Sequence, residues 1–254
     1  MMRRIIICAV AALTLNAGTV LASGGGKHPP DIKWSFEGIF GKFDAASRKR
    51  GFQVYSGVCA GCHALSMVTY RNLMDIGFTE DEVKAISAEF EVTDGPNDAG
   101  EMYTRPALPS DRFVSPFANE KAARSANGGA YPPDLSLIIK ARPNGADYLH
   151  ALLTGYHEAP PEGVTLNEGM NYNDYFPGNQ IAMPQPLSEG QVEYKDGVEA
   201  TLDQEARDVV QFLTWAASPE LETRKNMGVK VMLFLIVLTA MLYVIKRRVW
   251  SDLH

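Results

Sequence analysis

Two of the three cysteines of this chain lie in one five-residue motif, Cys59-Ala60-Gly61-Cys62-His63. C-x-x-C-H is the pattern through which a c-type haem is attached. The two-residue spacer lets both thiols reach the two vinyl groups of one porphyrin, and the histidine that follows can bind the iron. We therefore expect one haem c, covalently bound through Cys59 and Cys62, with His63 as a ligand of the iron.

Two other sites could use the same cysteines. A structural zinc site needs four ligands, but the sequence has no second cysteine pair. A thioredoxin-like dithiol does not need the histidine, and the surrounding sequence lacks the βαβ pattern of that fold. An export signal also favours the haem, because c-type haem is attached outside the cytoplasm.

That export signal is found in residues 1–22. Arg3 and Arg4 precede an apolar run that contains the third cysteine, Cys8, and small residues end the segment at Ala22. This order is typical of a secretory signal peptide. We expect cleavage after Ala22, or after Ser23 as the next choice. A retained membrane helix is disfavoured because the apolar run is short.

A second membrane signal lies near the C-terminus. Residues 227–246 are almost entirely apolar and approach the ~20 residues that cross a bilayer. Lys246-Arg247-Arg248 follow, and positive charge is retained on the cytoplasmic side. We expect a single anchor at 227–246, a cytoplasmic tail at 247–254, and a periplasmic domain at 23–226 on a bacterial cell membrane.

The charge of the exported part argues against nucleic acid as a ligand. Residues 23–226 contain 18 Lys and Arg against 29 Asp and Glu, a net charge of −11. Such a surface could attract a basic partner, or it could serve solubility alone.

The pattern of the domain predicts mainly helices joined by long loops. Apolar spacing and capping residues predict helices at 43–57, 79–90, 146–154 and 202–216. Residues 93–112 and 156–186 are predicted as loops, 192–201 as a candidate hairpin, and 220–226 as a linker to the anchor.

The iron needs a second axial ligand, and several residues could supply it. Methionine or histidine is usual, and methionine raises the reduction potential. Met183 lies in an apolar loop stiffened by Pro184 and Pro186, which favours it. The other candidates are Met102, Met170, His150 and His157. Arg124 and Arg142 are candidates to bind the haem propionates, although either could be an ordinary surface arginine.

Motifs across the whole mature chain resemble those of the cytochrome c1 family. The haem motif is followed by Tyr70-Arg71-Asn72-Leu73, and a rigid segment reads Asn127-Gly128-Gly129-Ala130-Tyr131-Pro132-Pro133-Asp134-Leu135. The other matching segments are Trp34–Gly38, Asp94–Asn97, Ala122–Arg124, Leu152–Tyr156, Tyr175–Gly178, Ile181–Met183, Arg224-Lys225 and Met227-Gly228.

The resemblance implies roles for particular residues. It assigns Met183 as the distal iron ligand and Arg124 as the arginine that meets a propionate. It also implies that residues 127–135 and 175–183 line the haem pocket, among them Asn127, Pro133, Tyr175 and Phe176.

The implied fold is a mainly α, class I cytochrome c-like domain with long loops plus one C-terminal transmembrane helix. In such a domain the helix before Cys59 packs against the helix at 202–216. The implied role is electron transfer in a dimeric ubiquinol–cytochrome c reductase, alongside cytochrome b, from the Rieske iron–sulfur protein to a soluble cytochrome c. The chain would then be no enzyme on its own. An anchored cytochrome c that serves a terminal oxidase is the alternative.

Overall fold

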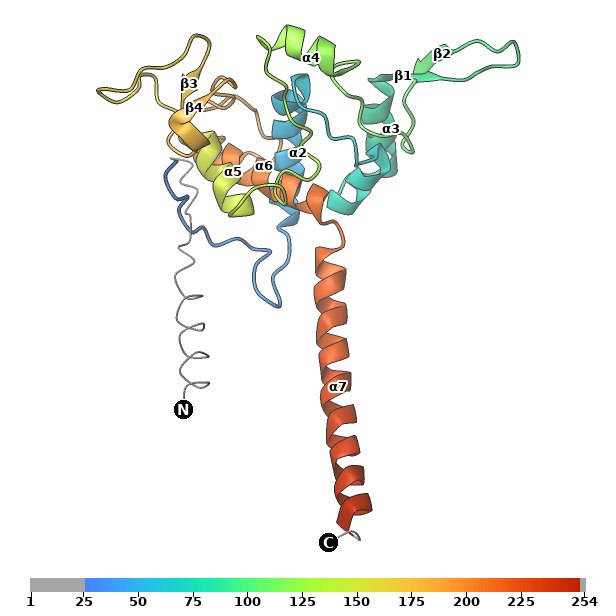
Figure 1. The fold of residues 1–254 in the computed structure, drawn as a ribbon. Coiled ribbons are helices and arrows are strands. Elements are labelled where there is room, and N and C mark those ends of the chain that lie inside the picture. Colours follow the sequence, from blue (N-terminus) through green and yellow to red (C-terminus); the bar gives the residue numbers. More distant parts are fainter. Residues whose placement is uncertain (1–25, 252–254) are drawn as a thin grey trace, which may run out of the picture.

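A helical head and one long projecting helix, α7 (Leu221–Trp250), make up the molecule (Figure 1). The structure is a computed structural model and describes residues 26–251. The expected signal peptide and the last residues of the tail therefore lie outside the described residues.

Helices α2 (Ala45–Gly57) and α6 (Leu202–Ala217) cross at the centre of the head. Asp44 and Thr201 cap them, each accepting a hydrogen bond from the backbone N–H three residues on. The helices meet at Gly51, where an added Cβ would overlap the backbone of Asp208. The expected packing of these two helices is confirmed.

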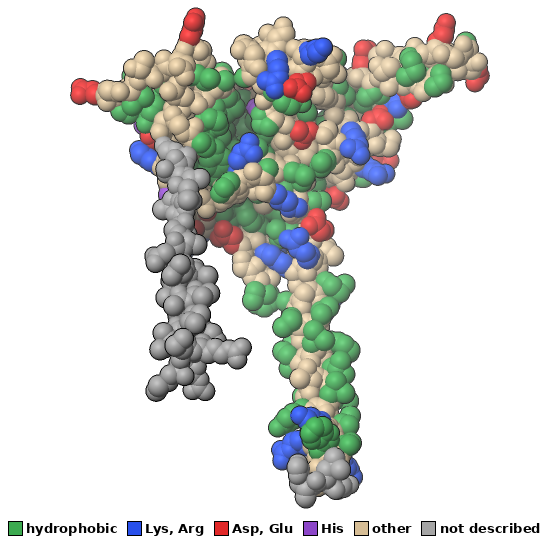
Figure 2. Space-filling model, in the orientation of Figure 1, with side chains coloured by type: hydrophobic (Ala, Val, Ile, Leu, Met, Phe, Trp, Pro, Cys, Tyr) green, Lys and Arg blue, Asp and Glu red, His purple; other side chains and the backbone are tan. Residues whose placement is uncertain are grey.

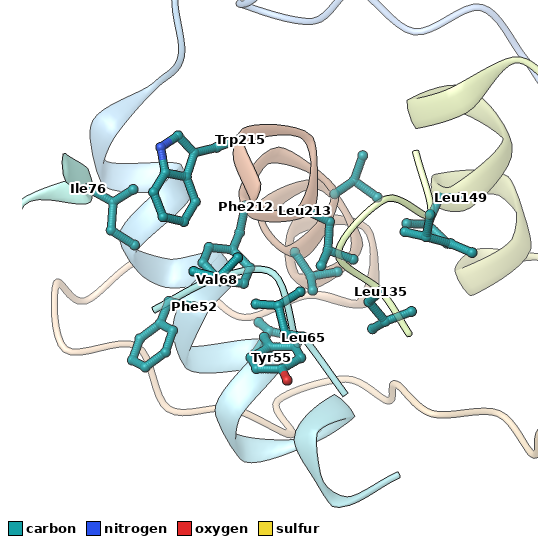
Figure 3. Packing of buried hydrophobic residues seen from close by; sticks show 14 of the residues in the cluster. Phe52, Tyr55, Leu65, Val68, Ile76, Leu135, Leu149, Phe212, Leu213 and Trp215 are labelled. Carbon is teal, nitrogen blue, oxygen red and sulfur yellow. The ribbon is translucent and has the colours of Figure 1, made fainter. Parts of the chain in front are cut away.

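The hydrophobic core spreads outward from this crossing (Figure 3). Phe212 packs its ring against Phe52 and Tyr55, with ring centroids 5.8 and 5.7 Å apart. Helix α5 (Gly145–Thr154) packs on the other side of α6. Leu65 and Leu135 are buried in the same cluster, so the segments after the cysteine motif and after α4 are fixed to the core.

The remaining elements are short. They are the 3₁₀ helices η2 (Cys59–Gly61), η3 (Tyr70–Ile76) and η4 (Pro177–Asn179), the helices α3 (Glu80–Ala88) and α4 (Glu120–Ala126), and the antiparallel pairs β1 (Glu91–Asp94) with β2 (Tyr103–Pro106) and β3 (Asn171–Tyr172) with β4 (Gln180–Ile181).

Four segments differ from the sequence predictions. Residues 156–186 are not wholly loop, because β3 and β4 pair there. Residues 93–112 are not wholly loop, because β1 and β2 pair there and Arg105 bridges Asp94 and Asp111. Residues 192–201 form no strand pair. They contain a turn in which Gly197 N–H donates to Tyr194 O at 3.3 Å, and Val192 N–H donates to Glu205 of α6 at 3.0 Å.

The expected linker at 220–226 is helical from Leu221 onward and runs without a break into the apolar segment. An ion pair one turn apart between Glu220 and Arg224, at 2.9 Å, supports this first turn. Among the described residues, α7 is the one helix long and apolar enough to cross a membrane.

Candidate functional site

The cysteine motif forms a tight turn directly after α2. The backbone N–H groups of Cys62 and His63 both donate to the carbonyl oxygen of Cys59, at 3.1 and 2.8 Å. Cys59 is half-buried and Cys62 is exposed, and both thiols are free. One turn therefore presents two thiols and an imidazole together, as attachment of a single porphyrin requires.

The imidazole of His63 has a fixed orientation. Its Nδ1 lies 2.8 Å from the carbonyl oxygen of Pro133. A carbonyl oxygen only accepts, so Nδ1 carries the hydrogen and Nε2 keeps a lone pair that can bind a metal. Burial lowers the pKa of His63, which favours the neutral, ligating form.

Backbone and side-chain hydrogen bonds hold the segment after His63 against the segment that contains Pro133. Leu135 N–H donates to Ala64 O at 2.9 Å, and Ser66 N–H donates to the Asp134 carboxylate at 3.0 Å. Met67 N–H donates to Ser136 Oγ at 3.1 Å. The contact between His63 and Pro133 is thus part of a rigid pair of segments.

Helix α4 brings Arg124 and Asn127 to the same region. Asn127 caps the helix and donates to Ala123 O at 2.7 Å. Arg124 forms an ion pair with Glu120 at 2.8 Å, donates to Gly129 O and lies over the Tyr131 ring. A pocket of about 280 Å³ beside Cys62 is lined by α4, the segment before it and the proline segment, including Pro116, Ala123, Tyr131 and Pro132.

The second predicted pocket segment, residues 175–183, is fixed by α5. Asn173 is fully buried; its amide donates to Leu152 O at 2.8 Å and accepts from the N–H groups of Tyr175 and Phe176. The Tyr175 ring lies so close to Gly155 that an added Cβ there would meet it at 2.5 Å. Figure 2 shows a hollow with hydrophobic side chains between the lobe of β3 and β4 and that of α4.

Met183 differs from the other candidate ligands in its surroundings. Its side chain is half-buried and packs against the core, and Tyr156 Oη donates to its carbonyl at 3.1 Å. Met102 is 61% exposed on the β1–β2 hairpin and Met170 is 37% exposed. The two histidines, His150 and His157, are each bonded through Nε2 to a carboxylate, at 2.9 and 3.1 Å.

The two candidate propionate arginines also differ. Arg124 has the three partners given above, whereas the exposed Arg142 donates to the neighbouring Ala141 carbonyl. Burial raises the pKa of Tyr148, and the charge of nearby Arg142 opposes that rise. Tyr148 in turn lies near Tyr156, which bonds Met183.

Three residues that position the site were not singled out for it from the sequence. They are Gly155, Tyr156 and Asn173. Gly155 and Tyr156 were included only within a matching segment of the family resemblance. Their contacts join positions 20 or more residues apart, so no local spacing could have revealed them.

The residues present fit a covalently bound haem. Two free thiols flank one turn, an oriented imidazole follows them, and a thioether lies on a loop held to the core. Within residues 26–251, no three His, Cys, Asp or Glu side chains cluster as a closed zinc site would need. The dithiol has no βαβ context, since the described strands form only two short antiparallel pairs.

Comparison with known proteins agrees with this chemistry. Residues 34–253 match the Cytochrome C1 family. The chain is 55% identical to "Cytochrome c1-2, heme protein, mitochondrial" of Solanum tuberosum, with 94% of this chain and 93% of that protein aligned. It is 48% identical to "Cytochrome c1" of Rhodospirillum rubrum over 98% of this chain and 97% of that one. It also aligns with 40% of the "Cytochrome b/c1" of Bradyrhizobium diazoefficiens, at 47% identity.

Proposed function

Because this chain belongs to the cytochrome c1 family, the haem subunit of the cytochrome bc1 complex, we propose that it relays single electrons from the Rieske iron–sulfur protein to a soluble cytochrome c. Cytochrome b would be its partner in the membrane, within a dimeric complex. The chain catalyses no bond chemistry of its own. Its acidic domain, with a net charge of −11, would attract a basic carrier.

Four residues hold the cofactor in this proposal. Cys59 and Cys62 form the thioethers, and His63 and Met183 bind the iron. When bound, haem c supplies an iron that takes up and releases one electron. Pro133 fixes the His63 imidazole through its carbonyl oxygen, which keeps Nε2 directed to the metal and increases its basicity.

The other pocket residues exclude water and hold the surrounding segments in place. Asn127 stabilises the end of α4, and Tyr175 and Phe176 are held by Asn173. One guanidinium is expected to meet a haem propionate. The resemblance assigns Arg124, which donates to Gly129 O in the segment expected to line the pocket, and Arg142 is the other candidate.

The proposed topology rests on α7 together with the signal peptide expected at residues 1–22. The signal peptide ends at residue 22, the haem domain occupies 23–226 in the periplasm, the anchor occupies 227–246, and the tail 247–254 is cytoplasmic. The run Lys246-Arg247-Arg248 at the far end of α7 supports this orientation.

The observation that carries the proposal is the His63–Pro133 hydrogen bond beside two free thiols, in a chain matched to the family over residues 34–253. That length of match also disfavours an anchored cytochrome c serving a terminal oxidase.

The test is purification from native membranes through a tag on this chain, followed by rapid-mixing kinetics. We expect cytochrome b and the Rieske protein to copurify, quinol to reduce the c-type haem only when the Rieske protein is present, and oxidised cytochrome c to reoxidise it. Quinol-driven reduction in preparations depleted of the Rieske protein would contradict the proposed route. Purification with an oxidase instead of cytochrome b would favour the alternative.

A further inference from the structure

A loop before α2 carries the two most exposed large hydrophobic side chains of the described residues. Ile39 is 69% exposed and Phe40 is 79% exposed. Even along α7, the most exposed apolar side chain, Val244, reaches only 64%. Adjacent apolar side chains with such large exposed fractions indicate a surface that a membrane or another molecule covers.

The loop is rigid, although its tip is exposed to solvent. Lys42 N–H donates to Ser35 O at 2.9 Å and closes the base. Gly38 adopts φ +67°, and an added Cβ on Gly41 would overlap the backbone of Glu37. These two glycines permit a tight turn that no other residue would form without strain.

The base of the loop is packed into the head. Phe36 is buried and lies between the rings of Trp34 and Phe43, with ring centroids 5.5 Å away on each side. Trp34 Nε1 donates to Asp147 at 2.7 Å. The exposed tip is therefore held on a fixed platform.

Side chains from the first turns of α7 tie this loop to the membrane helix. Lys225 Nζ donates to the carbonyl oxygens of Phe36 and Gly41, at 2.5 and 3.4 Å. Glu222 accepts from the backbone N–H of Phe43 at 3.0 Å. Figure 1 shows the loop, in blue, descending beside the start of α7 on the side of the head from which the helix leaves.

The level of the tip along α7 follows from these contacts. The apolar run begins at Met227, two residues after Lys225, which corresponds to about 3 Å of helix rise. The base of the loop is thus level with the end of the polar part of α7. The tip extends from there towards the apolar part.

The charges around the loop suit a lipid surface. Lys42 on the loop and Lys230 on α7 are exposed, Arg224 is paired with Glu220, and Figure 2 shows Lys and Arg side chains gathered where α7 leaves the head. The loop's own acid, Glu37, is turned back and accepts from Trp34 N–H at 3.4 Å. Basic residues around an apolar tip are typical of segments that enter the headgroup region of anionic membranes.

We propose that Ile39 and Phe40 insert into the phospholipid interface beside α7 and act as a second membrane contact that sets the tilt of the haem-bearing head. The inference rests on α7 crossing a membrane and does not depend on the electron route. In this proposal, Ile39 and Phe40 are covered by the boundary between lipid headgroups and acyl chains, rather than by another protein subunit.

The test uses the full chain with its haem, in vesicles of phosphatidylcholine and phosphatidylglycerol. A nitroxide spin label is attached at Phe40→Cys, and a matched label at Met102→Cys on the exposed β1–β2 hairpin. Cys59 and Cys62 do not react when they are held in thioethers. Collision of each label with oxygen, which partitions into lipid, is compared with collision with a water-soluble nickel chelate.

We expect the label at residue 40 to lose collision with the nickel chelate while it retains collision with oxygen, and the label at 102 to remain accessible to nickel. Equal nickel accessibility at both positions would overturn the proposal. Protection from both reagents in the purified complex would also overturn it, because a protein surface would then cover the loop. The haem absorption spectrum, recorded on the same samples, reports separately on the haem site.

Discussion

The backbone at Met183 is held by Tyr156, and its side chain lies against the core, so the loop can present sulfur in one place. A thioether favours ferrous iron and raises the reduction potential. We predict that Met183→Leu, which keeps size and apolarity, leaves the haem attached but lowers the potential markedly and opens the iron to carbon monoxide. Each 59 mV lost makes electron arrival less favourable by roughly 1.4 kcal/mol.

Redox titration and carbon monoxide difference spectra measure these effects. Met170→Leu is the matched control, because Met170 is more exposed and lies in the same long loop region. Met183→His would separate loss of a ligand from loss of its softness, since six-coordination could persist at a lower potential. An unchanged potential together with resistance to carbon monoxide in Met183→Leu would exclude Met183 as the ligand.

The two arginines allow a second residue-level prediction. A cation beside a propionate disfavours the added positive charge of ferric iron, so its loss should lower the potential. We expect Arg124→Gln to lower the potential more than Arg142→Gln, because Arg124 donates to Gly129 O in the segment expected to line the pocket. Potentiometric titration of both variants measures the two falls in reduction potential. A larger fall in Arg142→Gln would transfer the propionate role to Arg142.

Among the elements, the crossing of α2 and α6 is the contact that the rest of the head depends on. Gly51 lies against the backbone of Asp208 and the Phe212 side chain. We predict that Gly51→Ala pushes the helices apart and destabilises the head by about 1–3 kcal/mol. Gly57→Ala, at the end of the same helix with nothing within 4 Å of an added Cβ, is the control. Denaturant unfolding followed by far-UV circular dichroism should separate the two variants, and equal stability would contradict this account of the crossing.

Elements with local signals could be predicted from the sequence. The capping box of Thr79 and Glu82 begins α3 as expected, and the Thr201 cap begins α6. The strands β1 and β2 could not be predicted, because each has only four residues and neither buries a face: β1 alternates only between exposed and half-buried positions, and β2 is almost wholly exposed. They are held by Arg105 between Asp94 and Asp111, which is a tertiary contact.

The same distinction applies to the candidate site. The cysteine motif and His63 are adjacent in sequence, so their spacing alone indicates their chemistry. Pro133, which orients His63, is 70 residues away, and Asn173 acts through a carbonyl 21 residues away. Such contacts depend on the fold, and only the family resemblance drew attention to Pro133 beforehand.

At the scale of the whole molecule, α7 continues from the head into the anchor. Glu222 and Lys225, in its first turns, bond to the loop at 36–43. A chain that ends after Asn226 keeps both of these residues and their contacts with the loop at 36–43. We predict that it is released as a soluble, haem-containing periplasmic protein once the signal peptide is removed. Two inserted side chains alone would give only weak, reversible binding.

Fractionation of cells into periplasm and washed membranes measures this, with the full chain as the control. Retention of the shortened chain in washed membranes that lack its partners would contradict a single C-terminal anchor.

The central claim is that one haem is covalently bound at Cys59 and Cys62, and its most direct test is acid–acetone extraction of the purified full chain. The denatured protein is then assayed by its pyridine haemochrome spectrum. We predict that one haem per chain stays with the protein and shows the spectrum of two thioether bonds, and that replacing either cysteine with alanine shifts the spectrum to that of a single thioether. Extraction of all the haem from the unmodified chain would contradict the account.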